Sequence, residues 1–414
     1  MADVVMEDAA MPPPAPPRLV RTVSAGGIPV WRGSDIVVKE RASMNFDGLD
    51  PRDKEGRIRL DRVWFGPMTM DIAGETWKLE AFLNYGAEGQ TYLASRESTA
   101  EKYAAKFTNK KNSMEVKLVS ELPRQLVVHE NFIKFELVVN DVLDHFAPAE
   151  HIIFMEHVPN GELFELLASA EPGVQGKPVS EGTSRRILHD VISGMAECYR
   201  FGVTHRDLKP ENLLINEQGR IIIIDMGHAK RAPPSGYGAD NIPVPSLQRT
   251  TTTNAYGTPA FNAPEVKEGK SYDCECSDVW SVGVIAFYLH GKLPAFSAGG
   301  GMAEWKDAVG PDNAPLWTKI QKCGYYPAFP DDLKNFINTL WRLDPQERPS
   351  FSQLEKGISG DADTLAAFPG LQWLAKPVNA TGDFIAELQK SCPGKRFGTG
   401  TEEKPPEKTG AKRW

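Results

Sequence analysis

The feature that most constrains this chain is a polar run in its middle, His205-Arg-Asp-Leu-Lys-Pro-Glu-Asn212, followed by Ile224-Asp225-Met226-Gly227. Asp225 ends an isoleucine run and lies thirteen residues past Asn212, a spacing that fits a short β-hairpin between them. A lone Arg-Asp or Asp-x-Gly pair would mean little. Two such pieces at this spacing place two carboxylates, a lysine and an amide close together.

The two pieces together resemble the catalytic loop and the metal-binding loop of eukaryotic protein kinases, and Asp-Leu-Lys-Pro-Glu-Asn resembles the serine/threonine branch. The resemblance implies transfer of the γ-phosphate of ATP to serine and threonine hydroxyls of protein substrates. It implies that Asp207 orients and deprotonates the substrate hydroxyl and that Lys209 neutralises the moving phosphoryl group. Asn212 and Asp225 would bind Mg²⁺.

Length and composition agree with one large enzyme. The 414 residues leave room for a two-lobed catalytic domain with tails, and the motifs favour this over several ordinary domains. The net charge of −8 gives no reason to expect nucleic-acid binding, and no apolar run is long enough to span a bilayer. Five cysteines without a secretory signal indicate a reducing compartment, which we expect to be cytoplasm or nucleus.

Hydrophobic patterning predicts an α+β protein with the bilobal kinase fold, a β-rich N-lobe and an α-helical C-lobe. Strand-like alternation comes first along the chain, and helical spacing dominates from about Leu163 onward. We expect a disordered, Pro-containing tail over residues 1–56, the kinase domain with a strand extension over 57–358, and a mostly disordered tail over 359–414.

Each of the two expected tails contains one segment that could bind a partner or dock onto the domain. The run Met11-Pro-Pro-Pro-Ala-Pro-Pro17 is compatible with docking of an SH3- or WW-type partner, or with a plain solvated tail. Residues Phe384 to Leu388 are compatible with one short docking helix.

The nucleotide site starts at Leu83-Asn-Tyr-Gly86-Ala-Glu-Gly89-Gln-Thr91, which resembles the glycine-rich loop of the family. Gly86 and Gly89 would let the backbone approach phosphates, because a Cβ would intervene. The match is imperfect, since Asn84 replaces the first glycine of the pattern. Tyr103-Ala-Ala-Lys106 resembles the family's Val-Ala-Ile-Lys strand, and Lys106 would bridge the α- and β-phosphates.

Lys106 needs a carboxylate on the following helix, and two glutamates compete for this role. Glu121 lies fifteen residues beyond Lys106 and eight before His129-Glu-Asn131, which resembles the family's His-Pro-Asn turn. Glu115 lies only nine residues beyond Lys106, which leaves little room for a loop and a helical turn. We expect Glu121 to hold Lys106, with Glu115 as the alternative.

The segment from Met155 to Phe164 resembles the hinge between the lobes. The resemblance implies that Met155 is the gatekeeper, that the backbone of Glu156 and Val158 reads the adenine edge, and that Glu162 reaches the ribose. Apolar contacts to the nucleotide would come from Leu83, Ala104 and Leu214.

The segment from Asp225 to Glu265 resembles an activation segment, with an insertion at residues 232–248 and methionine at position 226 where phenylalanine is usual. Thr258, in Gly257-Thr-Pro259, would bond Asp207 and Lys209.

The resemblance also bears on how the activity would be controlled. Arg206 resembles the arginine that clamps an activating phosphothreonine, but Asn254 occupies that threonine's position. We expect Thr253, or another threonine of the run 250–253, to take the phosphate from an upstream kinase. The alternative is that these threonines are solvated and that the enzyme is constitutively active.

The frame of the large lobe also resembles the family. Asp278 would brace the catalytic-loop backbone, and Arg348 would pair with Glu265. The wording Gly161-Glu-Leu-Phe164 favours the calcium/calmodulin-dependent-like group. The rival to an active kinase is a catalytically weak, kinase-like scaffold that binds nucleotide.

Overall fold

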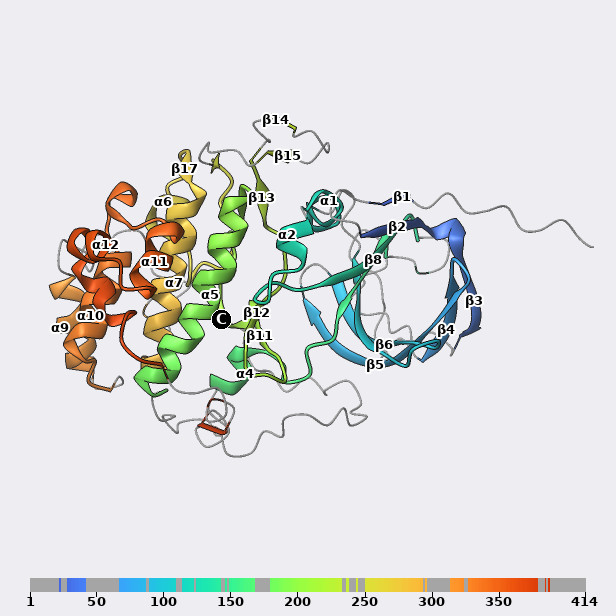
Figure 1. Cartoon of the computed structure of the whole chain (residues 1–414), viewed down its shortest axis with the longest axis horizontal. Coiled ribbons are helices and arrows are strands. Elements are labelled where there is room, and N and C mark those ends of the chain that lie inside the picture. Colours follow the sequence, from blue (N-terminus) through green and yellow to red (C-terminus); the bar gives the residue numbers. More distant parts are fainter. Residues whose placement is uncertain are drawn as a thin grey trace, which may run out of the picture.

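The computed structural model describes residues 22–23, 28–41, 67–86, 89–108, 114–122, 124–142, 146, 149–167, 179–232, 236–237, 243–244, 250–292, 295, 313–323, 327–378, 384 and 386–387. A β-rich small lobe and a helical large lobe lie side by side, as expected from the sequence (Figure 1). Helices α1 (Met114–Glu121) and α2 (Arg124–Val127) belong to the small lobe.

The described strands of the small lobe form one sheet in the order β1-β2-β8-β9-β7-β6-β5-β4-β3. Neighbouring strands are antiparallel except for the parallel pair β2 and β8. The strands are β1 (Thr22–Val23), β2 (Pro29–Arg32), β3 (Ile36–Arg41), β4 (Met68–Ile72), β5 (Glu75–Gly86), β6 (Gly89–Arg96), β7 (Lys102–Thr108), β8 (Phe135–Asn140) and β9 (His151–Glu156).

The N-terminal segment corrects the expectation that residues 1–56 form a disordered tail. Strand β2 extends one side of the sheet beside β8, whereas β3 pairs with β4 at the far edge. Only the turn Gly33–Asp35 separates β2 from β3, and so short a connection spans about 10 Å. The two sides of the sheet must therefore curve toward each other, and Figure 1 shows β2 and β3 meeting at one corner of the lobe.

Two long helices make the centre of the large lobe, α5 (Glu181–Arg200) and α7 (Cys274–Gly291). Helix α5 begins where Ser180 Oγ accepts the N–H of Thr183 at 3.3 Å, and it ends before Gly202, whose φ is +70°. The other described helices are α4 (Leu163–Leu167), α6 (Pro264–Lys267), α9 (Ala314–Cys323), α10 (Asp331–Leu340), α11 (Phe351–Ile358) and α12 (Ala362–Ala367).

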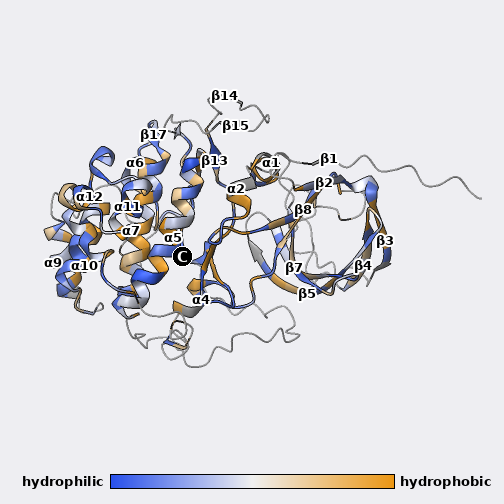
Figure 2. Ribbon diagram, in the orientation of Figure 1, coloured by the Kyte–Doolittle hydropathy of each residue, from blue (hydrophilic) through white to orange (hydrophobic). Residues whose placement is uncertain are grey.

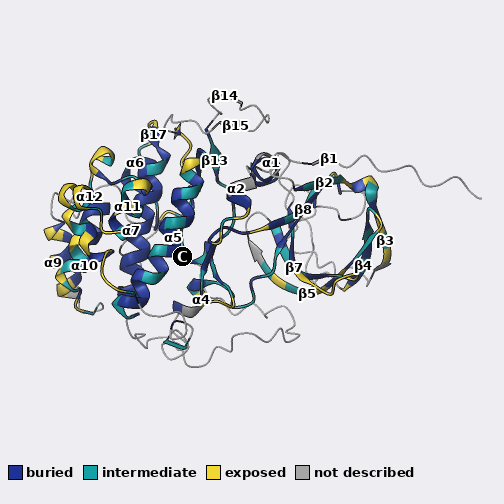
Figure 3. Cartoon of the chain, viewed as in Figure 1, coloured by how far each residue is buried: buried dark blue, intermediate teal, exposed yellow. Residues whose placement is uncertain are grey.

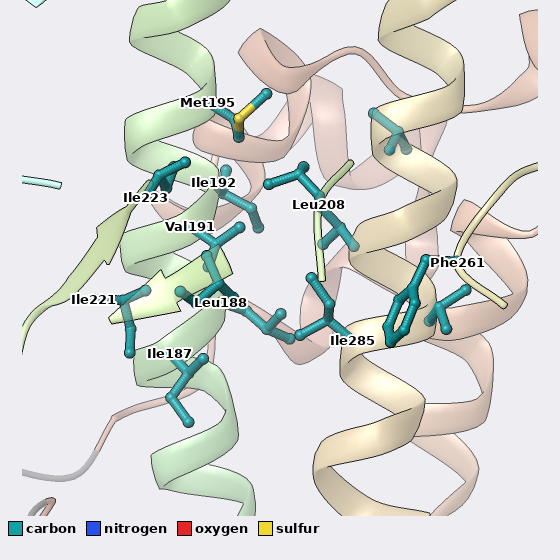
Figure 4. Packing of buried hydrophobic residues seen from close by; sticks show 14 of the residues in the cluster. Ile187, Leu188, Val191, Ile192, Met195, Leu208, Ile221, Ile223, Phe261 and Ile285 are labelled. Carbon is teal, nitrogen blue, oxygen red and sulfur yellow. The ribbon is translucent and has the colours of Figure 1, made fainter. Parts of the chain in front are cut away.

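Helix α7 is buried along almost its whole length (Figure 3). Much of it consists of hydrophobic residues (Figure 2). In Figure 4, Leu188 and Val191 of α5 point toward α7, from which Ile285 meets them. Ile221 and Ile223 belong to the same cluster and lie on the side of α5 that faces away from α7. Apolar side chains at helical spacing thus pack α5 against α7, and this core of the large lobe supports the polar loops.

Four short two-stranded sheets are described outside the small-lobe sheet. Their strands pair as β10 with β13, β11 with β12, β14 with β15, and β16 with β17. Their bounds are β10 (Val203–Thr204), β11 (Leu213–Ile215), β12 (Ile221–Ile223), β13 (Lys230–Arg231), β14 (Gly236–Tyr237), β15 (Pro243–Val244), β16 (Thr251–Thr252) and β17 (Tyr272–Asp273).

Part of the region 359–414 is also structured, which corrects the expectation of a mostly disordered tail. Trp373 is buried and donates from Nε1 to Glu181 at 2.9 Å, and Phe384 is buried in the large-lobe core. Glu387 accepts hydrogen bonds from the Ser180 N–H and the Thr183 hydroxyl at the start of α5. Residues Phe384, Ala386 and Glu387 are helical, whereas Leu388 lies outside the described residues.

The expected ion pair between Arg348 and Glu265 is present. Arg348 donates to both carboxylate oxygens of Glu265, at 2.5 and 3.0 Å, and its side chain is fully buried. Removing one partner would leave a buried charge, at a cost of roughly 3–5 kcal/mol. Among the described helices, none combines the length and the hydropathy needed to cross a membrane.

Candidate active site

The catalytic loop lies between β10 and β11, where its backbone is held by one buried carboxylate. Asp278 accepts the N–H groups of His205 and Arg206, each at 2.8 Å, and the hydroxyl of Tyr199 at 2.9 Å. Arg206 has a φ of +69°, a strained conformation for a residue with a side chain. Asp278 thus performs the bracing role that the sequence predicted.

Asp207 lies at the centre of a polar cluster whose members the sequence motifs predicted. Its Oδ2 lies 2.8 Å from Lys209 Nζ, and its Oδ1 accepts both the N–H and the hydroxyl of Thr258 at 2.8 Å. Lys209 also donates to Thr258 Oγ1 at 2.8 Å. The expected contacts of Thr258 with Asp207 and Lys209 are therefore confirmed.

The surroundings of Asp207 keep it ionised. Burial opposes ionisation, but contact with His228 and the charge and hydrogen bond of Lys209 outweigh burial and lower the pKa of Asp207. The Nδ1 atom of His228 lies 3.7 Å from Asp207 Oδ2. An ionised carboxylate beside a lysine can accept a proton from a hydroxyl held next to it.

Asn212 is turned by Asp207 into a fixed orientation. Its Nδ2 donates to the Asp207 carbonyl at 2.8 Å and to Asp207 Oδ2 at 3.3 Å. Both donated bonds use the amide nitrogen, so the amide oxygen is the atom left for a ligand.

Asp225 follows β12 and has a φ of +65°. Its Oδ1 lies 2.9 Å from Lys106 Nζ and accepts the Gly227 N–H at 3.3 Å. Burial opposes ionisation of Asp225, but the charge and hydrogen bond of Lys106 hold its pKa below the ordinary value.

The partner of Lys106 on the following helix is Glu115, and the expectation of Glu121 is wrong. Lys106 Nζ lies 2.6 Å from Glu115 Oε2, and Glu115 is buried. Helix α1 already begins at Met114, so Glu115 stands in its first turn, whereas Glu121 is its last residue. The short sequence distance left enough room because the helix starts so early.

Asn212 and Asp225 provide amide and carboxylate oxygens, which are the donors that Mg²⁺ prefers. In the described part of the chain no group of three or more His, Cys, Asp or Glu side chains could hold a metal by itself. Magnesium is usually bound by one or two carboxylates together with substrate phosphates, so a site completed by a nucleotide fits these residues.

The glycine-rich segment is the hairpin of β5 and β6, in which Gly86 pairs with Gly89. A Cβ on Gly89 would lie 1.9 Å from the carbonyl oxygen of Phe107, so the sheet itself requires glycine there. Leu83 is 41% exposed on β5. Residues 87–88 of the turn lie outside the described residues.

The hinge residues lie beside the lysine strand. Ala104 and Met155 are paired across β7 and β9, and both are buried. The Glu156 N–H donates to the Lys134 carbonyl at 2.8 Å, so that N–H is not free to read a base. Within the described part of the chain, the backbone of Val158 makes no hydrogen bond, which leaves its polar groups for a ligand.

Two site contacts escaped the sequence reasoning. Asn84 Nδ2 donates to Glu162 Oε1 at 2.6 Å, which links the glycine-rich hairpin to the residue expected to hold the ribose. The backbone of Glu162 also pairs with that of Leu214 in an isolated antiparallel β-bridge. The second missed contact is that of His228 with Asp207. The departure at Asn84 from the glycine pattern was the only sequence signal for either.

The comparisons with known proteins agree with this geometry. The protein-family model described as "Protein kinase domain" matches residues 77–357 of this chain. CBL-interacting protein kinase 11 of Oryza sativa subsp. japonica is 32% identical over 334 residues, which cover 78% of this chain and 56% of that protein. CBL-interacting serine/threonine-protein kinase 18 of Arabidopsis thaliana is 29% identical over 313 residues, which cover 75% and 54%.

The chain thus spans just over half the length of these curated relatives. The family match covers more than half of the chain and contains the lysine strand, the hinge, the catalytic loop and the metal-binding loop. The chain belongs to the protein kinase domain family, in its eukaryotic serine/threonine branch.

Proposed function

We propose that this protein is an active serine/threonine kinase that transfers the γ-phosphate of Mg-ATP to hydroxyls of protein substrates. The observation that carries the proposal is the contact of Lys106 with both Glu115 and Asp225. This arrangement joins the lysine strand, helix α1 and the metal-binding loop, as phosphoryl transfer in protein kinases requires.

The chain's own residues divide the chemistry among them. Asp207 receives the proton of the substrate hydroxyl, and Thr258 and Lys209 hold that carboxylate in place. Lys209 is also close enough to Asp207 to neutralise negative charge that develops beside it. Lys106 and the backbone of the glycine-rich hairpin bind the phosphates, and Glu162 binds the ribose. Mg²⁺, held by Asn212 and Asp225, would neutralise phosphate charge.

The partners and the location of this protein are part of the proposal. The names of the relatives state that those proteins interact with CBL, but the match covers just over half their length. For this chain we propose ATP and proteins with accessible serine or threonine. The SH3- or WW-type partner of residues 11–17 and an upstream kinase stay predictions, and residues 11–17 lie outside the described part of the chain. Cys198 and Cys274 are buried free thiols, which supports cytoplasm or nucleus.

A peptide array incubated with purified protein and Mg-ATP tests the function and the residue preference together. The wild type should phosphorylate serine and threonine peptides. Asp207→Asn should lower turnover by about 10²–10⁴-fold while ATP still binds, because this carboxylate acts on the hydroxyl. Asp363→Asn, on the exposed face of α12, is the matched control and should behave as the wild type. A wild type that binds ATP without transferring phosphate would support the scaffold instead.

A further inference from the structure

Arg206 is a buried cation that is already held by the chain itself. The residue is 7% exposed, and its guanidinium donates to the Asn254 carbonyl at 3.0 Å and to the His228 carbonyl at 3.2 Å. Among the described residues, no carboxylate lies within ion-pair distance of it. Within the described part of the chain, carbonyl dipoles and an aromatic ring therefore compensate its charge.

Tyr256 provides the ring. The guanidinium carbon of Arg206 lies 4.9 Å from the centre of the Tyr256 ring, a distance at which a cation is attracted to an aromatic face. His228 also stacks on this ring, with centroids 5.5 Å apart and planes inclined by 20°. Tyr256 thus contacts the arginine before Asp207 and the histidine that lies 3.7 Å from the Asp207 carboxylate.

The backbone around Tyr256 is built for this close approach. Gly257 has a φ of +97°, and a Cβ there would lie 2.5 Å from the Arg206 carbonyl oxygen. The Asn262 side chain donates to the Tyr256 carbonyl at 3.1 Å. Residues 256–258 therefore press against the catalytic loop at both Arg206 and Asp207.

Asn254 completes the arrangement with its backbone. Its carbonyl oxygen accepts both Arg206 and the hydroxyl of Tyr272, the latter at 2.8 Å. A carbonyl with two donors and a stacked ring thus occupy the arginine to which a phosphate would otherwise bind. Strand β16 pairs with β17 in the same region, so backbone hydrogen bonds hold this part of the segment beside the arginine.

We propose that Tyr256 is a positioning residue that holds the catalytic loop through Arg206 and His228, so that catalysis needs no phosphate on the activation segment. The inference rests on the proposed kinase function and specifies how it is regulated. It selects constitutive activity over the phosphorylation of Thr253 that the sequence favoured. Thr253 is exposed, and the arginine that would receive its phosphate is engaged elsewhere.

The test compares Tyr256→Ala, Tyr256→Phe and the control Leu343→Ala, which also truncates an exposed apolar side chain. Tyr256→Ala should lower kcat about tenfold, because a cation–π contact and the stacking of His228 are lost. Its KM for ATP and its Tm should stay near the wild-type values, since Tyr256 is half exposed and its ring contacts among the described residues are with Arg206 and His228, neither of which we assign to the nucleotide site. Tyr256→Phe should restore most of kcat because it keeps the ring.

A second arm treats the wild-type protein with phosphatase and verifies by intact mass that no phosphate remains. The treated enzyme should keep its full kcat, and Thr253→Ala should as well. A kcat that falls on phosphatase treatment and returns on phosphorylation would overturn the inference but leave the kinase function intact. Equal kcat for Tyr256→Ala and the wild type would also overturn it. Absence of transfer in every form would overturn both the function and the inference.

Discussion

Glu115 joins three parts of the site through one carboxylate. Its Oε2 lies 2.6 Å from Lys106 Nζ, and its Oε1 accepts the backbone N–H of Met226 at 3.3 Å. Met226 is fully buried, so the methionine that replaces the usual phenylalanine packs inward, as a large apolar residue should. Glu115 therefore links helix α1 to strand β7 and to the metal-binding loop.

Replacing Glu115 by Gln should lower kcat by about ten- to a hundredfold, because the lysine loses the charge that holds it against the phosphates. Glu121→Gln, at the last residue of the same helix, is the matched control and should stay within about twofold of the wild type. Steady-state kinetics on a peptide substrate measure both. A larger loss in Glu121→Gln than in Glu115→Gln would contradict the pairing in the structure.

The role of Asp225 in metal binding can be tested by the thermal shift that Mg-ATP produces. Mg-ATP raises the Tm of the wild type because it binds the native state, and the rise grows with affinity. Asp225→Asn should show a much smaller rise with Mg-ATP, since one metal-binding oxygen loses its charge. Asp363→Asn serves as control. An unchanged shift in Asp225→Asn would remove this residue from the metal site.

The parts of the site that could be predicted are those written in short, contiguous motifs. The loop from His205 to Asn212 fixes its own internal contacts, so Asp207, Lys209 and Asn212 are found together. The choice between Glu115 and Glu121 failed because it depended on where a helix begins, and helix starts are poorly determined by spacing. The contact of Asn84 with Glu162 joins residues 78 positions apart, which no local pattern encodes.

The terminal regions show the same limit. Proline content and weak periodicity made residues 1–56 read as disordered, yet Ile36 is buried and Val38 partly buried on alternate positions of β3. Strand β2 pairs with β8, whose residues follow more than a hundred positions later. Pairing over such distances depends on the folded small lobe, and composition alone cannot reveal it.

The bond between Asn84 and Glu162 predicts an effect on nucleotide binding. Asn84→Ala should raise the KM for ATP about fivefold with kcat unchanged, because a hydrogen bond to a charged group holds the ribose-binding carboxylate. The effect should be smaller with 2′-deoxy-ATP, which lacks one of the hydroxyls. Asn160→Ala removes a comparable amide, which bonds the Asn216 carbonyl, and is the control. A KM for ATP in Asn84→Ala equal to that of the control would separate Asn84 from the ribose site.

The final prediction concerns the N-terminal strands that close the small lobe. Gly33 lies in the turn between β2 and β3, and a Cβ there would lie 2.0 Å from the backbone carbonyl oxygen of Asp141. Because the three nearest atoms all belong to the backbone of Asp141 and Val142, the turn must shift to admit even a methyl group. Gly33→Ala should therefore lower the stability of the small lobe by about 1–3 kcal/mol, the usual range for overpacking.

Ser34→Ala changes the next residue of the same turn, whose side chain is exposed, and should leave the Tm unchanged. Thermal unfolding of the two variants and of the wild type measures the difference, and limited proteolysis shows whether the cut falls in the N-terminal segment. If Gly33→Ala unfolds at the same temperature as Ser34→Ala and resists protease equally well, the strands at the N-terminus do not hold the two sides of the sheet together. A lower Tm with cleavage near the turn would place that function in residues 28–41.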